Sequence, residues 1–152
     1  PTCSAPPSPT ASGGPTGAWG GFTNGQVPRD QLCALGVAPH RLRCDAAAAY
    51  TAMSAAYELT FGDPLCITDS YRSLDAQVDA HHRKPRITAV PGSSNHGWGL
   101  AVDLCGGINV FGTAQTAWMT ANAARYGWVH PTWAQASGAN PEPWHWEFGR
   151  LG

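Results

Sequence analysis

The spacing of apolar residues along the chain predicts three helices. Over residues 46–59, four alanines lead into tyrosines and a methionine at helical spacing, and Asp45 can serve as the N-cap. Ser73 can cap a short second helix over 74–82. A third helix is expected over 114–126, where a glycine directly after it provides a stop.

Short apolar stretches between these helices predict strands. Residues 65–68 and 100–104 are two candidates, and a Gly-Gly pair breaks the second one. The other candidates lie at 128–129 and 144–148. Because Gly, Pro, Ala and Trp are also plentiful, this mixture indicates a loop-rich α+β domain rather than a bundle of long helices.

The N-terminal segment differs in composition from the rest of the chain. Residues 1–25 contain five Pro, six Gly and seven Ser or Thr, with little that could form a core. The 152 residues fit one domain that is large enough to bury a real core. We therefore expect an arm or linker over residues 1–26 and one folded domain over residues 27–152.

Charge gives little indication of a polyanionic partner. The formal net charge is −1, and Lys84 is the only lysine. This balance provides no attraction toward nucleic acid or an anionic membrane. No apolar run is long enough to span a bilayer. We expect neither a nucleic-acid partner nor a membrane span, and we expect a monomer.

The cysteine spacing favours disulfides. No two cysteines form a CxxC motif, so neither a thiolate zinc site nor a thioredoxin-like motif is expected. Our preferred pairs are Cys33–Cys44, which closes a short loop, and Cys66–Cys105, which joins two predicted strands; Cys3 is then left over. Disulfides imply an oxidising, extracytoplasmic setting. The alternative is five reduced, buried cysteines.

Three residues far apart in the chain make up a natural zinc ligand set. His96 and Asp103 flank a glycine-containing turn that leads into a predicted strand, and His145 lies in an aromatic, strand-like run. Two imidazoles and one carboxylate can bind zinc and leave a position open for water, from which Glu142 could remove a proton. Such a site would be carried by strands, unlike the helical HExxH arrangement. Each residue taken singly also fits a loop, strand-end or core role.

The same residues carry a resemblance to a known family. The pattern SxHx₆D at residues 94–103, followed by ExxH at 142–145, resembles the zinc D-alanyl-D-alanine carboxypeptidases of the VanY and VanX type, peptidase family M15. The segments TDSYRS at 68–73 and PGSSNHG at 91–97 extend the match. The resemblance covers residues 27–148, and three separate blocks occur in the expected order.

The resemblance implies a role for each of the central residues. His96, Asp103 and His145 would bind zinc. Glu142 would be the general base that activates water, and then the acid that protonates the leaving amine. Arg72 would bind the substrate carboxylate or stabilise the oxyanion, since its planar fork suits either task.

Other residues are candidates for the surrounding cleft. Ser94 would hydrogen-bond the substrate near the metal, with a turn-stabilising role as the alternative. Trp98, Trp144 and Trp146 are candidates for the cleft walls, although a core role is expected for at least one of them. Glu147 competes for the role of base, because residues two apart on a strand share a face and Glu147 could therefore lie beside His145. Its alternative roles are a partner that orients an imidazole and a surface residue.

The resemblance implies an α+β domain of the hedgehog/D,D-peptidase type, in which a small antiparallel sheet carries the zinc and helices flank it. The implied activity is removal of the terminal D-Ala from peptidoglycan stem peptides ending in D-Ala-D-Ala, by a bacterial enzyme that is secreted and associated with the cell wall. One alternative is an endopeptidase that cuts cross-bridges or an L-Ala–D-Glu bond. Another is a non-catalytic, zinc-stabilised domain that binds the cell wall or a protein.

The basic run at 81–84 is interpreted as a solvated helix end, with contact to an anionic cell-wall polymer as the alternative.

Overall fold

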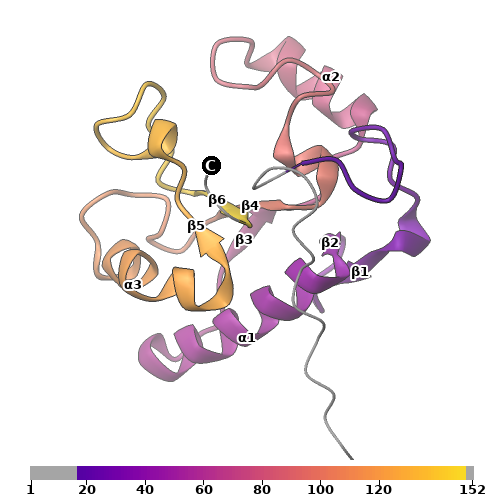
Figure 1. Cartoon of the computed structure of the whole chain (residues 1–152). Coiled ribbons are helices and arrows are strands. Elements are labelled where there is room, and N and C mark those ends of the chain that lie inside the picture. The colour runs from indigo at the N-terminus through magenta and orange to yellow at the C-terminus, as the bar shows by residue number, and fades with distance from the viewer. Residues whose placement is uncertain (1–16, 150–152) are drawn as a thin grey trace, which may run out of the picture.

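The computed structural model describes residues 17–149, and their mixture of small sheets and helices confirms the α+β expectation (Figure 1). In chain order the main elements are β1 (Leu32–Ala34), β2 (Arg41–Arg43), α1 (Cys44–Phe61), β3 (Ile67–Asp69), α2 (Leu74–Arg83), β4 (Ala101–Leu104), α3 (Ala114–Asn122), β5 (Trp128–Val129) and β6 (His145–Phe148). A 3₁₀ helix, Asn95–Trp98, shortly precedes β4, and another, Ala123–Tyr126, continues α3. Across the described range, no helix combines the length and apolar character needed to cross a membrane.

The main sheet has four antiparallel strands in the order β3-β4-β6-β5. Strands β4 and β6 pair with Val102 opposite Trp146 and with Asp103 opposite His145. Because successive side chains on a strand point to opposite faces, these two pairs lie on opposite faces of the sheet. Val102 and Trp146 belong to the hydrophobic core. Asp103 and His145 therefore project from the other face.

The core occupies only one face of this sheet. Helix α1 contributes Tyr50 and Met53 to it, and α3 contributes Met119. The fully buried Trp128 on β5 packs edge-on against Tyr50, with 6.3 Å between the ring centroids. In Figure 1, α1 and α3 lie below the strands and α2 lies above them. The face that carries Val102 is thus covered by α1 and α3, and the opposite face is left for polar side chains.

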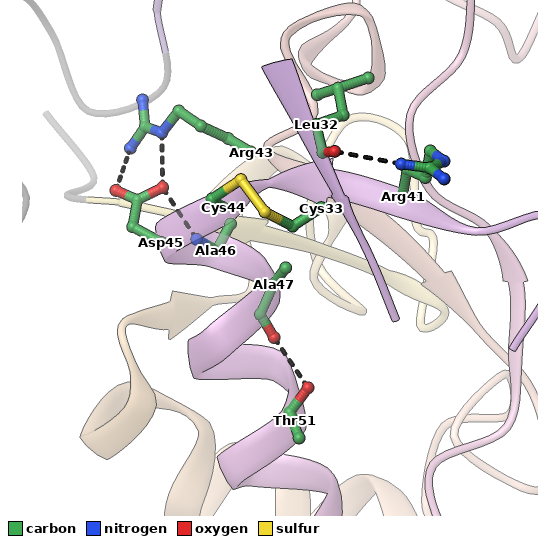
Figure 2. Close-up of a disulfide and its surroundings, with 9 residues drawn as sticks. All are labelled: Leu32, Cys33, Arg41, Arg43, Cys44, Asp45, Ala46, Ala47 and Thr51. Atoms are coloured by element: carbon green, nitrogen blue, oxygen red, sulfur yellow. Dashed lines mark hydrogen bonds and ion pairs between the residues drawn. A yellow bond between two sulfur atoms is a disulfide. The ribbon is translucent and has the colours of Figure 1, made fainter. Parts of the chain in front are cut away.

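The helix ends agree in part with the sequence. Ser73 is the N-cap of α2, and its hydroxyl accepts a hydrogen bond from the Ala76 amide at 3.2 Å, as predicted. The predicted cap of α1 was wrong, because strand β2 runs directly into the helix and Arg43 takes the N-cap position. Asp45 instead lies in the first turn, where it forms a hydrogen-bonded ion pair with Arg43 at 2.6 Å (Figure 2).

Both preferred disulfides are present. The Cys33–Cys44 bond joins β1 to the start of α1 (Figure 2), and the Cys66–Cys105 bond joins the segments beside β3 and β4. Cys3 lies outside the described residues. Strands β1 and β2 form a separate antiparallel pair that the sequence pattern did not predict. The two covalent links therefore hold this small hairpin to the helix and hold one edge of the main sheet together.

The described part of the expected N-terminal arm, residues 17–26, packs along the 3₁₀ helix that precedes β4. The Trp19 indole donates a hydrogen bond to the carbonyl of Trp98 at 2.8 Å. The Gly25 amide donates to the carbonyl of Gly97 at 2.9 Å, and the carbonyl of Gly25 accepts from the Leu74 amide at 2.9 Å. We call residues 17–26 the N-terminal strap. It connects the segment that carries His96 to the start of α2.

Candidate metal centre

His96, Asp103 and His145 meet on the sheet face opposite the core. One ligand atom from each lies within 4.8 Å of the others. Asp103 Oδ1 is 3.3 Å from His96 Nε2 and 3.2 Å from His145 Nδ1. The β4–β6 register sets the Asp103–His145 pair, and the 3₁₀ helix before β4 brings His96 beside it. The three predicted ligands therefore form one compact group, although they are separated by up to 49 positions along the chain.

The outer nitrogen of each imidazole is already occupied. His96 Nδ1 lies 2.8 Å from the carbonyl oxygen of Ser70, and His145 Nε2 lies 2.8 Å from Glu147 Oε1. Both partners only accept hydrogen bonds, so each outer nitrogen carries the hydrogen. When both imidazoles are neutral, this leaves the lone pairs of His96 Nε2 and His145 Nδ1 facing the Asp103 carboxylate. Two lone pairs against an anion repel one another unless a cation lies between them, so the donor set fits a metal ion and its usual outer partners.

The electrostatics of the site also favour a cation. Burial acts to raise the pKa of Asp103, but the neighbouring charges and hydrogen bonds of His96 and His145 outweigh it and hold that pKa well below its usual range. Burial acts to lower the pKa of His145, but Asp103 and Glu147 outweigh it and raise the pKa to about 9. In the metal-free protein at neutral pH, a proton on His145 therefore takes the place that a metal ion would fill.

Glu142 lies beside the ligand group and is held from several sides. Its Oε2 is 4.0 Å from His145 Nδ1, and Asn140 donates a hydrogen bond to its Oε1 at 2.9 Å. Its backbone amide donates to the carbonyl of Ala134 at 2.8 Å, and His130 Nε2 donates to its carbonyl at 2.9 Å. Burial is the main cause of the raised pKa of the Glu142 carboxyl. A carboxyl with a raised pKa close to a metal site suits proton transfer.

Glu147 has a different environment from Glu142. It is buried on β6, two residues beyond His145, and its carboxylate accepts the hydrogen bond from His145 Nε2. Burial acts to raise the pKa of Glu147, but the bond and charge of His145 outweigh it, so the pKa is lowered and the group stays ionised. Of the roles considered from the sequence, this geometry supports that of a partner that orients an imidazole.

Arg72 lies on the other side of Asp103. Its Nε donates to Asp69 Oδ2 at 2.8 Å, and its Nη2 also contacts Asp69. The same Nη2 is 3.7 Å from Asp103 Oδ2. Asp69 thus fixes the orientation of the guanidinium, which remains close to the ligand group and lines the cavity in front of it.

A cavity of about 1260 Å³ opens onto these residues. Some of the other residues predicted for the cleft line it, and others do not. Ser94 and Trp144, two of the candidates for the cleft, line it. Ser94 also caps the 3₁₀ helix, where its hydroxyl accepts a hydrogen bond from the His96 amide at 3.2 Å. Trp98 is not among the lining residues; it packs against the hydrophobic core, so its predicted place in the cleft wall was wrong. Trp146 is also in the core.

The tryptophan that the sequence analysis missed is Trp133. It lines the cavity, and its ring centroid is 5.0 Å from that of His145. Trp133 belongs to a short 3₁₀ turn in the long connection between β5 and β6. No periodicity or motif marks such a position, so only the three-dimensional path of the connection reveals it.

Buried amides support the backbone that carries His96. Asn24 of the N-terminal strap donates to the carbonyl of Ser94 at 2.7 Å and accepts from Gln77 Nε2 at 3.0 Å. Asn24 and Gln77 are almost completely buried, and both pack against Gly97. A Cβ at Gly97 would overlap both amide groups. The glycine next to His96 is therefore required by close packing against the strap.

Comparison with known proteins agrees with this arrangement. The profile of the VanY family, D-alanyl-D-alanine carboxypeptidase, matches residues 39–151. The chain belongs to the VanY D-alanyl-D-alanine carboxypeptidase family. The resemblance found in the sequence motifs is thereby confirmed.

One similar curated protein is a D-alanyl-D-alanine carboxypeptidase of Enterococcus faecalis, which is 34% identical over 82 residues. The match covers 51% of this chain and 29% of the relative, so the chain spans under a third of that protein's length.

Two solved structures share the fold. The vancomycin-resistance D,D-pentapeptidase VanY from a VanB-type cassette, an E175A mutant in complex with Zn(II), has a TM-score of 0.62 and 24% identity, with 77% of each chain covered. The LD-carboxypeptidase LdcB has a TM-score of 0.63 and 26% identity, with 82% of this chain and 71% of LdcB covered. The hedgehog/D,D-peptidase-like fold expected from the motifs is that of these neighbours.

The packing at Gly97 leads to a first prediction. Gly97→Ala should lower the free energy of unfolding by about 1–3 kcal/mol, the usual cost of overpacking, and should weaken zinc binding because it displaces the backbone of His96. Thermal unfolding and competition with a chelating indicator measure the two effects. Asn24→Ala/Gly97→Ala should be less destabilised than the sum of the single variants, because removing the amide makes room for the new methyl group. Additive effects in this double-variant cycle would contradict the proposed overlap.

The raised pKa of His145 predicts proton release on metal binding. Below about pH 9 the metal-free site holds a proton on His145, and zinc must displace it. The affinity for zinc should therefore increase by about tenfold per pH unit between pH 6 and 8 for each proton displaced. Titration calorimetry in buffers of different ionisation enthalpy counts the protons released. A zinc affinity that does not change with pH would contradict the prediction.

Proposed function

We propose that this protein is a zinc-dependent D,D-carboxypeptidase that removes the terminal D-Ala from peptidoglycan stem peptides ending in D-Ala-D-Ala. The observation that carries the proposal is the convergence of His96, Asp103 and His145 beside Glu142. A purely structural metal would require neither that carboxylate nor the oriented Arg72 on the other side. Membership of the D-alanyl-D-alanine carboxypeptidase family supports the choice of substrate.

In this proposal, His96 Nε2, Asp103 Oδ1 and His145 Nδ1 would hold the zinc ion. The donor set is typical of catalytic zinc, and a relative with the same fold has been crystallised with Zn(II). When bound, zinc supplies Lewis acidity, which polarises a carbonyl group and lowers the pKa of water. Ser70 and Glu147 keep the two imidazoles in the tautomers that this role requires.

Glu142 is assigned the role of general base and then acid. Its Oε1 is fixed by Asn140, and its Oε2 is directed toward the ligand group. It can accept a proton from the attacking water and pass it to the leaving amine of D-Ala. The raised pKa of Glu142 favours the second step, because a carboxyl that holds its proton more firmly is present as the acid closer to neutral pH.

Arg72 is assigned to the anionic groups of the substrate. A carboxypeptidase must recognise the free carboxylate one residue from the bond that it cuts, and the planar guanidinium can bind such a group through two hydrogen bonds. The contact between Arg72 and Asp69 holds this fork beside the ligand group. Ser94 and Trp144 line the same cavity and are proposed to contact the substrate.

The proposal also covers where the protein acts and which other peptidase activities compete with the D,D-carboxypeptidase activity. Two disulfides support secretion to an oxidising compartment, where the cell wall is the available substrate. L,D-carboxypeptidase activity is a specific second candidate, because LdcB is 26% identical and has a similar fold. Endopeptidase activity would use the same metal chemistry with a longer cleft.

Mass analysis of digested peptides separates these candidates. Purified muropeptides would be incubated with the protein in the presence of zinc or of a chelator. Zinc-dependent conversion of pentapeptides to tetrapeptides is the expected result. Conversion of tetrapeptides to tripeptides would indicate L,D-carboxypeptidase activity, and cleavage of cross-linked dimers would indicate an endopeptidase. A protein that binds zinc yet cleaves none of these substrates would be a non-catalytic binding domain.

The two glutamates should respond differently to substitution. Glu142→Gln should lower kcat by a factor of about 10² to 10⁴, the usual contribution of a positioned general base, while zinc remains bound. Glu147→Gln should weaken zinc binding by about 10- to 100-fold, as expected for the outer partner of a metal-binding histidine, and should retain most of the turnover at saturating zinc. Metal analysis and steady-state kinetics measure both. The reverse pattern would identify Glu147 as the base.

A further inference from the structure

Helix α2 forms one wall of the cavity and leads away from the metal centre. Ala76, Ala80 and Arg83 line the cavity, and their spacing places them on one face of the helix. The two alanines are small and leave the cleft open along the helix. Lys84 and Arg86 continue this lining in the turn that follows. The cleft therefore extends from Arg72, just before α2, to a group of cations at the far end of the helix.

The charges that line the cleft are separated between its ends. The lining carboxylates all belong to the contact network around the ligand group: Asp69, Asp103, Glu142 and Glu147. The lining cations at the other end are Arg83, Lys84 and Arg86. Arg83 is in an exposed ion pair with Asp79 at 2.9 Å, and Lys84 and Arg86 are exposed to solvent. The helix dipole places only about half a negative charge at the carboxyl end of α2. This is less than the two positive charges of Lys84 and Arg86, so the far end of the cleft keeps a net positive charge.

The length of α2 sets the distance between the two ends. Its ten residues, Leu74–Arg83, rise by about 1.5 Å each, so the helix spans about 15 Å. An extended peptide covers about 3.3–3.6 Å per residue. A substrate whose scissile bond lies at the ligand group would therefore reach the cationic end about four residues upstream. The distance falls to about three residues where one of them is linked through its side chain and so adds two atoms to the backbone path.

We propose that Lys84 and Arg86 form an anion subsite that binds a carboxylate on the third residue before the scissile bond. This inference rests on the proposed function and names the substrate feature that the far end of the cleft recognises. In a stem peptide of the form L-Ala-γ-D-Glu-L-Lys-D-Ala-D-Ala, that residue is the γ-linked D-Glu, whose α-carboxylate is free. The subsite thus selects stem peptides with this free carboxylate over those in which it is amidated.

Two synthetic pentapeptides test the proposal directly. They are N-acetyl-L-Ala-γ-D-Glu-L-Lys-D-Ala-D-Ala and its α-amide, which differ by one negative charge and share the same scissile bond. At low ionic strength the wild-type protein should cleave the carboxylate form with a kcat/KM about fivefold higher, the size expected of one or two partly solvated ion pairs. The preference should decrease to less than about twofold in 0.5 M NaCl, where charges more than a few ångströms apart are screened.

Charge-matched variants show whether this preference belongs to the subsite. Lys84→Gln/Arg86→Gln should cleave both peptides at the rate at which wild type cleaves the amide. Arg29→Gln/Arg125→Gln removes the same charge from exposed residues that do not line the cavity and should keep the wild-type preference. Melting temperatures of the two double variants confirm that both are folded.

Each outcome has a distinct meaning. Equal cleavage of the two peptides by the wild-type protein would overturn the subsite and leave the carboxypeptidase function standing. A preference that survives in Lys84→Gln/Arg86→Gln, or that is lost equally in Arg29→Gln/Arg125→Gln, would show that it arises from the overall charge or from another part of the cleft. Cleavage of neither peptide, with zinc bound, would overturn the proposed function and this inference together.

Discussion

The pairing of β4 with β6 is the constraint on which the site depends. Their register places Asp103 directly opposite His145, and the alternation of side chains places Val102 and Trp146 on the other face. A shift of one residue would bury Asp103 in the core and expose Val102, so the apolar face defines the register and thereby the positions of the proposed metal ligands. The packing of α1 and α3 on the apolar face thus holds Asp103 and His145 in place from the opposite side of the sheet. Disulfide Cys66–Cys105 holds the neighbouring strand β3, which leads to Arg72, against the same sheet.

The second constraint is electrostatic. Three carboxylates and two imidazoles are gathered in a partly buried space, and each has a hydrogen bond or an opposite charge that compensates for the loss of water. Glu147 and Ser70 direct the imidazole hydrogens outward, so the lone pairs converge on one point. The two glutamates, five residues apart in the chain, have opposite pKa shifts for this reason: Glu147 is bonded to an imidazole, whereas burial dominates at Glu142. Environment, rather than residue type, therefore distinguishes the proposed base from the proposed orienting partner.

The parts of the fold that the sequence predicted are those with a strong local signal. The three helices, the strands of the main sheet and both disulfides follow from apolar spacing, Ser73 and the cysteine positions. Strands β1 and β2 were missed because β2 has a single apolar residue between two arginines, so the sequence shows no second apolar stretch to pair with β1. The cap of α1 was misplaced because β2 continues into the helix without a turn. At the site, motifs located the ligand group. Trp98 packs against the core instead of lining the cavity, and Trp133 lines the cavity but was not predicted, because the path of a loop has no periodic signature.

The ligand group and the walls of the cleft come from different parts of the fold, which explains how one metal centre can serve several activities. The proposed ligand residues and Glu142 lie on, or next to, strands whose positions are set by the core, so the core determines their arrangement. The walls of the cleft come from α2, its following turn and the β5–β6 connection, which the core constrains much less. A D,D-pentapeptidase and an LD-carboxypeptidase that share this fold are consistent with that arrangement. In the proposed function, selectivity for the length and charge of the peptide would therefore reside mainly in these walls, among them α2, where small alanines lead to an exposed basic turn.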